Sequence, residues 1–307
     1  MSCRRSLAFS CWWVDNLVSR YKVRNPLYID VCQQLRADNL LTNKDPAVMH
    51  GMLPNDHMAM RTLHLPQQGL GLHVLDVALQ RYGYQRRDDY YFAEKKIAAR
   101  WYESPGAPIL PRIFASELRV EQLPSEIGAL LQRYVRSKSA LALDNDAAAT
   151  QHIATASNEA FLEMAYRNLE AMDATLYDKV PSRQDYETIR AATEYGAWTL
   201  LHGHRINHCT IPVQWLGAPY NAMDKFVEYA QNVLQLRMND GGAVQQSDDG
   251  QLLQSSTQAV LGYFLFRGDT EPTRVPGSFL EFIERHREGF AVGNADRIFE
   301  STSVKQH

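Results

Sequence analysis

The same order of predicted elements occurs twice along the chain, and this repeat limits the possible folds more than any other feature of the sequence. In the first copy, residues 55–65 (NDHMAMRTLHL) predict a strand, and residues 71–84 (GLHVLDVALQRYGY) carry apolar side chains at helical spacing. Two further strand candidates follow at 88–104 and 110–120, separated by the turn sequence SPGAP. The first half of the chain is therefore predicted to contain a strand, a helix and then several strands.

The second copy lies in the C-terminal third of the chain. Residues 205–213 (RINHCTIPV) predict a strand, residues 222–236 predict a helix, and residues 257–268 and 277–286 predict strands. The segment at 239–250 is polar and rich in glycine, which is typical of a mobile loop. The two copies share an architecture but few residues, and together they predict two βαβββ modules.

Helical segments precede and separate these modules. Residues 1–50 show a polar, amphipathic helical pattern, and three further amphipathic helical patterns lie between the two copies. We therefore expect an α+β fold in a single catalytic domain spanning residues 1–307. Its parts are an N-terminal helical segment (1–50), a first module (51–121), a helical insertion (122–200) and a second module with a C-terminal tail (201–307).

The composition excludes two classes of partner. A net charge of −3 and a pI near 6.4 provide no basic surface for a nucleic acid. The longest apolar runs, such as AVLGYFLF, are much shorter than the ~18 residues that a membrane span needs. With 45% hydrophobic and 22% charged residues, the chain has the composition of a soluble globular protein.

Cysteine usage and the N-terminal segment bear on the compartment. The chain has four cysteines: Cys3, Cys11, Cys32 and Cys209. They have no CxxC spacing, so they predict neither a disulfide framework nor a zinc site. A reducing, cytoplasmic location is therefore expected. Residues Trp13, Leu17 and Tyr21 recur at roughly helical intervals, which favours a first helix of the mature protein. An organelle matrix is the alternative if this segment is a transit peptide.

The first strand of each copy carries a histidine. Strand alternation places His57 and Arg61 on one side of the first strand, which combines a possible metal ligand with a possible carboxylate-binding group. If the two modules pair about a pseudo-twofold axis, their first strands line one cavity, and His57 and His208 face each other. The metal would then lie inside a cupped sheet.

A carboxylate in the last predicted strand completes the candidate site. In residues 277–286, alternation places Glu281 between Phe279 and Ile283, where a carboxylate is costly to bury unless it is paired or bound to a cation. Two histidines and one carboxylate form the facial triad of non-haem Fe(II) oxygenases, and no thiolate is placed to favour structural zinc.

The residues alone leave alternatives open. His202 and His204 compete with His208, and Glu284 replaces Glu281 if the strand is shifted by one residue. Each histidine, taken singly, is more often a hydrogen-bonded structural residue than a ligand. Arg61 could pair with a carboxylate such as Glu117 instead of binding a substrate.

Six sequence blocks, in order from about residue 12 to the C-terminus, resemble the 2-oxoadipate dioxygenase/decarboxylase family, formerly a domain of unknown function. They are NDHMAMRT, YYFAEKKIAARWYE, PRIFASEL, GHRINHCTIPV, VPGSFLEFIER and GFAVGNADRIFEST. The resemblance implies a vicinal-oxygen-chelate-like fold, Fe(II) held by His57, His208 and Glu281, and a substrate carboxylate bound by Arg61. It also implies that O₂ and a small 2-oxo acid are the substrates, with 2-oxoadipate converted to 2-hydroxyglutarate and CO₂ in lysine catabolism.

Two other functions remain as alternatives. One is a metal-dependent hydrolase, lyase or isomerase, because this type of fold supports several chemistries. The other is a non-catalytic module in which Arg61 binds an anion. The sequence makes no prediction of the oligomeric state or of whether the insertion forms a lid.

Overall fold

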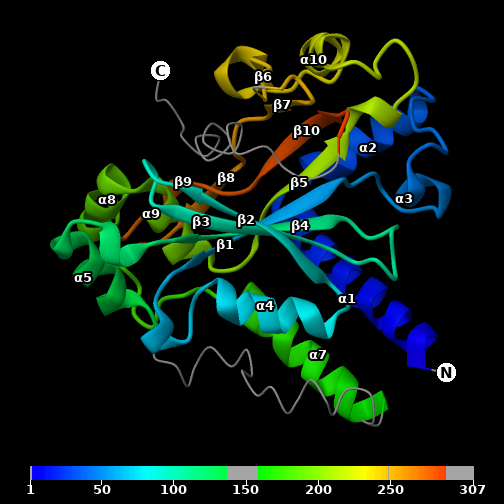
Figure 1. Ribbon diagram of the computed structural model, residues 1–307. Coiled ribbons are helices and arrows are strands. Elements are labelled where there is room, and N and C mark those ends of the chain that lie inside the picture. Colours follow the sequence, from blue (N-terminus) through cyan, green and yellow to red (C-terminus); the bar gives the residue numbers. More distant parts are fainter. Residues whose placement is uncertain (1, 137–157, 248, 288–307) are drawn as a thin grey trace.

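The computed structural model describes residues 2–136, 158–247 and 249–287. The larger of its two sheets is formed by strands of both predicted modules (Figure 1). The eight strands have the order β2-β3-β4-β1-β5-β10-β7-β6. The sheet is curled, as expected for a cupped arrangement. The two modules join where β1 and β5, the first strand of each module, pair in antiparallel fashion. Equivalent strands of the two modules therefore lie next to each other at the centre of the sheet.

The first module has the predicted order of elements. Strand β1 pairs in parallel with β4, and β3 pairs in antiparallel fashion with both β4 and β2. The elements are β1 (His57–Leu63), α4 (Leu72–Arg81), β2 (Gln85–Phe92), β3 (Ile97–Glu103) and β4 (Arg112–Leu118). The expected single strand at 88–104 is wrong, because a turn at residues 93–96 divides it into a hairpin, and Lys96 has a φ of 57° there.

The second module repeats this pairing. Strand β5 is parallel to β10, β10 is antiparallel to β7, and β7 is antiparallel to β6. The elements are β5 (Ile206–Pro212), α10 (Met223–Asn232), β6 (Gln245–Gln246), β7 (Leu252–Ser256) and β10 (Phe279–Arg285).

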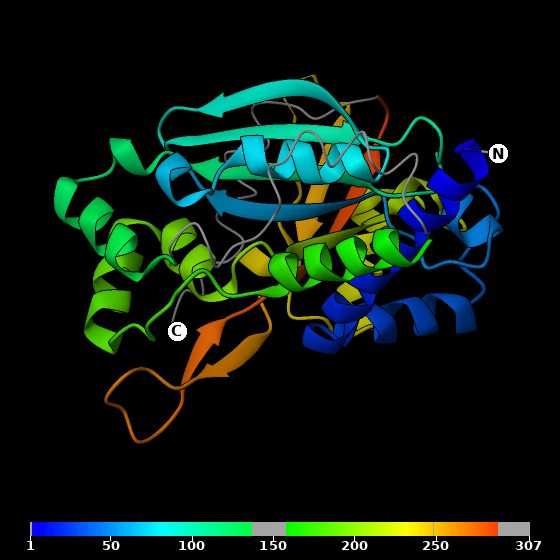
Figure 2. The ribbon, with the colours of Figure 1, turned by 90° about the horizontal axis from the view of Figure 1, so that it is seen from below.

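Two predictions for the second module are wrong. Residues 257–268 are not a strand of this sheet, since β8 (Leu261–Phe264) pairs with β9 (Thr273–Pro276) in a separate hairpin that extends away from the large sheet (Figure 2). The module's strand is instead β7, and its partner β6 lies in the segment predicted as a mobile loop. The reason is that β7 is half polar: Gln254, Ser255 and Ser256 are buried, and this hides the apolar alternation that marks a strand.

The predicted helices are present before and between the modules. The N-terminal segment forms α1 (Ser2–Arg24), α2 (Leu27–Ala37) and α3 (Pro46–Met49). The described part of the insertion forms α5 (Ser125–Tyr134), α7 (Asn158–Asp173), α8 (Arg183–Ala192) and α9 (Glu194–His202). Short 3-10 helices lie at Pro66–Gln68, Val120–Gln122, Val213–Trp215 and Asn239–Gly242. In the described ranges, no helix combines the length and the apolar character that crossing a membrane requires.

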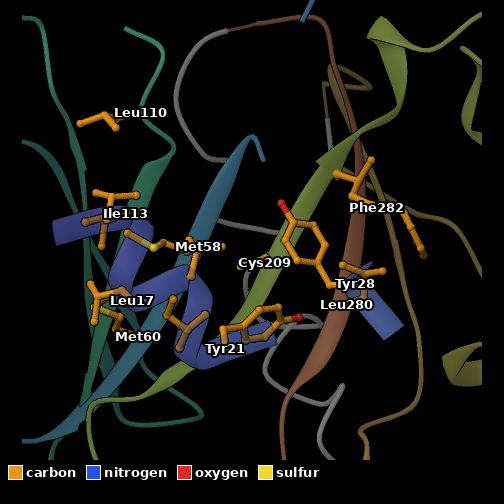
Figure 3. Packing of buried hydrophobic residues seen from close by; sticks show 14 of the residues in the cluster. Leu17, Tyr21, Tyr28, Met58, Met60, Leu110, Ile113, Cys209, Leu280 and Phe282 are labelled. Carbon is orange, nitrogen blue, oxygen red and sulfur yellow. The ribbon is translucent and has the colours of Figure 1, made fainter. Parts of the chain in front are cut away.

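Two apolar clusters lie on opposite faces of the sheet. On one face, Met58 of β1, Cys209 of β5 and Leu280 of β10 lie near Tyr21 of α1 and Tyr28 of α2 (Figure 3). The second cluster contains side chains of α5, α8 and α9 with residues of β1, β3 and β4. Because neighbouring residues of a strand point to opposite faces, His57, His208 and Glu281 turn away from α1. The N-terminal helices thus position the central strands from behind.

Candidate metal centre

The centre of the site is a row of side chains across three adjacent strands. The register pairs His57 of β1 with Thr210 of β5, and Thr210 with Glu281 of β10. His208 precedes Thr210 by two residues and so shares its face of the sheet. The Thr210 hydroxyl lies 3.1 Å from His57 Nε2 and donates a hydrogen bond of 3.1 Å to Glu281 Oε1. Side chains from both modules therefore meet at β5.

His57, His208 and Glu281 are close enough to contact one ion. One ligand atom from each lies within 4.8 Å of the others. The His57 Nε2–Glu281 Oε1 distance is 3.3 Å, and the His208 Nε2–Glu281 Oε1 distance is 3.9 Å. All three residues are buried, with at most 4% of their surface exposed. Two imidazoles and one carboxylate in a buried cluster are a donor set that fits a divalent transition metal.

Each histidine is oriented by the residue before it. His57 Nδ1 lies 2.9 Å from Asp56 Oδ1, and His208 Nδ1 lies 3.1 Å from Asn207 Oδ1. These partners hold Nδ1 of each ring and leave Nε2 directed at Glu281. Metal-binding histidines generally have such a partner on their other nitrogen.

A buried ion pair holds Asp56 in turn. Arg285, at the end of β10, donates from Nη2 to Asp56 Oδ1 at 2.7 Å and from Nε to Oδ2 at 3.1 Å. Arg112 of β4 adds a contact of 3.3 Å to Oδ2. The carboxylate beside His57 is therefore fixed by strands of both modules.

The charges of these groups follow from this packing. Burial by itself would raise the pKa of Asp56, but Arg285 and His57 lower it strongly, so the carboxyl is ionised. Burial also opposes ionisation of Glu281, yet the two histidines lower its pKa. Burial lowers the pKa of His208 to about 3, whereas hydrogen bonds to Asp56 and Glu281 outweigh burial and raise the pKa of His57. The cluster thus places the ionised Glu281 carboxylate beside the neutral His208 imidazole, and both are forms that can bind a metal cation.

The structure separates the alternative residues from this cluster. His204 Nε2 lies 3.0 Å from the Thr62 hydroxyl, and His202 Nε2 lies 2.9 Å from the carbonyl oxygen of Pro276. Glu284 accepts hydrogen bonds from the Met223 N–H and His286. Geometry therefore groups His208 and Glu281, and not these neighbours, with His57.

Arg61 is buried on the same face of β1 as His57, with 2% of its surface exposed. The alternative ion pair with Glu117 is not formed: Glu117 accepts from the Leu72 N–H at 2.8 Å and from Arg119 at 3.4 Å. In the part of the chain that the structure describes, Arg61 Nη1 is a buried donor without a hydrogen-bond partner. Burial lowers the pKa of Arg61 to about 10, which leaves it charged at neutral pH.

The sequence reasoning missed the residues that support the candidate ligands. A polar residue precedes each histidine in the printed sequence, as Asp56-His57 and Asn207-His208, and this repeated pair was an available signal. No local sequence pattern indicates that Arg285 binds Asp56, because the two residues are 229 positions apart in the chain.

Comparisons with known proteins agree with this geometry. A sequence profile described as 2-oxoadipate dioxygenase/decarboxylase matches residues 13–286. The chain belongs to this family. It is 32% identical over 279 residues to the chloroplastic/amyloplastic 2-oxoadipate dioxygenase/decarboxylase of Oryza sativa subsp. japonica, covering 82% of this chain and 70% of the rice protein. The family resemblance seen in the sequence and the enzyme class expected from it are thereby confirmed.

Solved structures agree on the fold. The hydroxyglutarate synthase of Oryza sativa, in complex with 2-oxoadipate, superposes with a TM-score of 0.75 at 28% identity, covering 98% of this chain and 94% of that one. A putative glyoxalase superfamily protein from Ralstonia eutropha gives a TM-score of 0.67 at 22% identity, covering 92% of this chain and 83% of that one. The expected vicinal-oxygen-chelate-like architecture is therefore confirmed for this member of the 2-oxoadipate dioxygenase/decarboxylase family.

Proposed function

We propose that this enzyme converts 2-oxoadipate and O₂ into 2-hydroxyglutarate and CO₂, with Fe(II) held by His57, His208 and Glu281. The observation that carries the proposal is the convergence of these three buried side chains, from strands of two modules, in a member of this family. The reaction balances without a further reactant: the C1–C2 bond breaks and C1 leaves as CO₂, one oxygen atom of O₂ enters the new carboxylate at the former keto carbon, and the other becomes the new hydroxyl group.

The donor set supports iron rather than structural zinc. Imidazole and carboxylate are suitable ligands for Fe(II), and a set of three protein ligands leaves positions for other ligands. Cys209, the cysteine nearest in sequence to these residues, lies on the opposite face of β5 in the apolar cluster behind the sheet. When bound, Fe(II) supplies the redox chemistry and a Lewis-acidic centre for a 2-oxo acid.

The protein's own groups then bind and orient the substrate. Asp56 and Asn207 keep Nε2 of both histidines available, and the Phe279 ring packs against the His208 ring with centroids 4.5 Å apart. We assign Arg61 to the distal carboxylate of the substrate, because its guanidinium is buried and charged and its Nη1 has no hydrogen-bond partner among the described residues. A guanidinium can bind a carboxylate through two parallel hydrogen bonds.

Gas exchange tests the reaction directly. The iron-loaded protein is incubated with a panel of 2-oxo acids, and O₂ uptake, CO₂ release and the product acid are measured. We expect one O₂ consumed and one CO₂ released for each 2-oxoadipate, and no turnover without O₂. Turnover that continues without O₂ would favour the hydrolase, lyase or isomerase alternative, and no turnover of any 2-oxo acid would contradict the proposal.

The organisation and location of the enzyme are part of the same proposal. We propose a single catalytic domain over residues 1–307, since both modules supply candidate ligands and one sheet contains them. Among the described residues, Cys11, Cys32 and Cys209 are free thiols, which supports a reducing compartment. We propose the cytoplasm, with an organelle matrix as the alternative because the rice relative is named as a chloroplastic/amyloplastic protein.

A further inference from the structure

We propose that Tyr195 and Trp198, two residues of the helical insertion, are positioning residues that hold Arg61 for the distal carboxylate and so make the enzyme selective for 2-oxo dicarboxylic acids. This inference rests on the proposed function, which gives Arg61 its ligand. It assigns the selectivity to α9, an element outside both modules that supplies none of the candidate metal ligands.

Two aromatic rings contact the Arg61 guanidinium. Its Cζ atom lies 4.8 Å from the centroid of the Tyr195 ring and 5.0 Å from the centroid of the Trp198 ring. Both residues are buried, and they are three residues apart on α9, so they project from the same side of the helix. Desolvated contacts of a guanidinium with aromatic rings are attractive. The two rings therefore hold the position of a cation that forms no ion pair within the described residues, although the charge of Glu194, at the start of α9, acts on it and raises its pKa against the larger effect of burial.

The two rings are themselves fixed by their polar atoms. The Tyr195 hydroxyl donates to the carbonyl oxygen of Ser116 at 2.8 Å and lies 2.9 Å from the Ser116 hydroxyl. Trp198 Nε1 donates to the carbonyl oxygen of Gly277 at 2.8 Å, just before β10 begins. One ring is thus attached to β4 in the first module and the other to the start of β10 in the second. The position of Arg61 is set relative to both modules.

In this arrangement Arg61 still lacks a hydrogen-bond acceptor for its Nη1 group among the described residues. The faces of the two rings offer no oxygen acceptor to the guanidinium N–H groups. A carboxylate approaching in that plane would supply acceptors for two N–H groups at once. A 2-oxo monocarboxylic acid of equal length lacks this second carboxylate and would leave the buried donor unsatisfied, which is unfavourable. The cost of an unmatched donor is the physical basis of the selectivity.

Paired ligands test the inference by binding rather than by turnover. Dissociation constants for 2-oxoadipate and 2-oxohexanoate are measured anaerobically on the iron-loaded protein, for the wild type and for Trp198→Leu, Trp198→Phe, Tyr195→Leu and Tyr195→Phe. We expect Trp198→Leu and Tyr195→Leu to weaken 2-oxoadipate binding about tenfold and to change 2-oxohexanoate binding less than about twofold. The two phenylalanine variants keep a ring and should retain most of the preference.

A matched variant separates positioning from general destabilisation. Tyr186 is a buried tyrosine of α8 whose ring packs on Phe266 at 4.9 Å, so Tyr186→Leu should lower the melting temperature without changing the preference for the dicarboxylic acid. Equal losses for both ligands in the Trp198 and Tyr195 leucine variants, or no loss for either, would overturn the inference.

A metal-independent measurement distinguishes failure of the inference from failure of the proposed function. Binding of adipate and hexanoate to the protein as isolated should show the same preference and the same loss in Trp198→Leu. If the wild type turns over no 2-oxo acid but keeps this preference, the proposed reaction fails and the role of α9 stands. If turnover occurs and the preference is absent or unaffected by the substitution, the role of α9 fails alone.

Discussion

His57 and His208 have the same ring but different supporting residues. Asp56 places a negative charge 2.9 Å from His57 Nδ1, whereas Asn207 places a neutral amide oxygen 3.1 Å from His208 Nδ1. A carboxylate partner makes an imidazole more basic than an amide partner does. The two histidines are therefore unequal donors, with His57 the stronger one.

Asp56→Asn is expected to weaken Fe(II) binding by about 10- to 100-fold, because it removes the charge that supports His57. The dissociation constant can be measured by competition with a coloured chelator at a temperature where the variant is folded. Asp45→Asn is the matched control: Asp45 is also a buried aspartate, but it caps α3 and accepts from the Ala47 N–H. An unchanged dissociation constant in Asp56→Asn would contradict the role of Asp56.

Two glutamates of β10 provide a sharper comparison. Glu281→Gln keeps the side-chain volume but removes the charged oxygen near both histidines, so metal binding should fall more than about 100-fold, beyond the usual effect of a supporting residue. Glu284→Gln should retain metal binding, because Glu284 accepts from the Met223 N–H and His286 instead. Metal content after dialysis measures both. Similar metal contents in the two variants would show that Glu281 is not a ligand.

At the scale of elements, α1 acts as a support for the sheet and not as an appendage. The Trp13 ring stacks on Tyr82, at the end of α4, with centroids 4.2 Å apart and planes 9° from parallel. The Tyr21 hydroxyl donates to the carbonyl oxygen of Phe279, the first residue of β10. The first helix therefore contacts both modules, including the strand that carries Glu281.

Trp13→Ala should lower the free energy of unfolding by about 3–5 kcal/mol, the usual cost of removing a fully buried tryptophan. Trp12→Ala is the comparison, since Trp12 is only partly buried and makes an edge contact with Tyr166, and its cost should be clearly smaller. Urea unfolding followed by fluorescence measures both values. Equal effects of the two substitutions would contradict this view of α1.

At the scale of the whole molecule, buried neutral histidines make stability depend on pH. Burial lowers the pKa of His204 to about 4, and burial likewise lowers the pKa of His202 to about 4. When the pH falls below the ordinary value near 6.5, the unfolded chain binds protons that the folded chain does not. Stability is thus lost between about pH 6.5 and about pH 4, and this contribution levels off below pH 4.

For His204 alone, the loss over this interval is roughly 3 kcal/mol in the free energy of unfolding. His204→Gln should therefore be less sensitive to acid than the wild type: the difference in stability between the two proteins should shift in favour of the variant as the pH falls from 7 to 4. Urea unfolding at a series of pH values gives this difference. Parallel curves would contradict the assignment.

The local pattern of the sequence was enough for part of the site. Strand alternation predicted that His57 and Arg61 share a face of β1, and the same rule predicted that Glu281 shares a face of β10 with Phe279 and Ile283. Helical spacing located α1, α4 and α10. These predictions depend only on the period of a single element, and that period is written in neighbouring residues.

Other features depend on contacts that no local pattern contains. Arg285 holds Asp56 across 229 residues of sequence, and the rings of Tyr195 and Trp198 reach Arg61 from a separate helix. His208 belongs to the cluster because the register pairs it with Phe279 of β10, whereas His204 lies before β5 and contacts the Thr62 hydroxyl. The sequence by itself determined most of the elements and the face that each side chain takes within them, because those properties are local; the half-polar β7 was an exception. Tertiary structure decided which charges, rings and ligands meet, because strand register and helix packing are set by the whole buried interior.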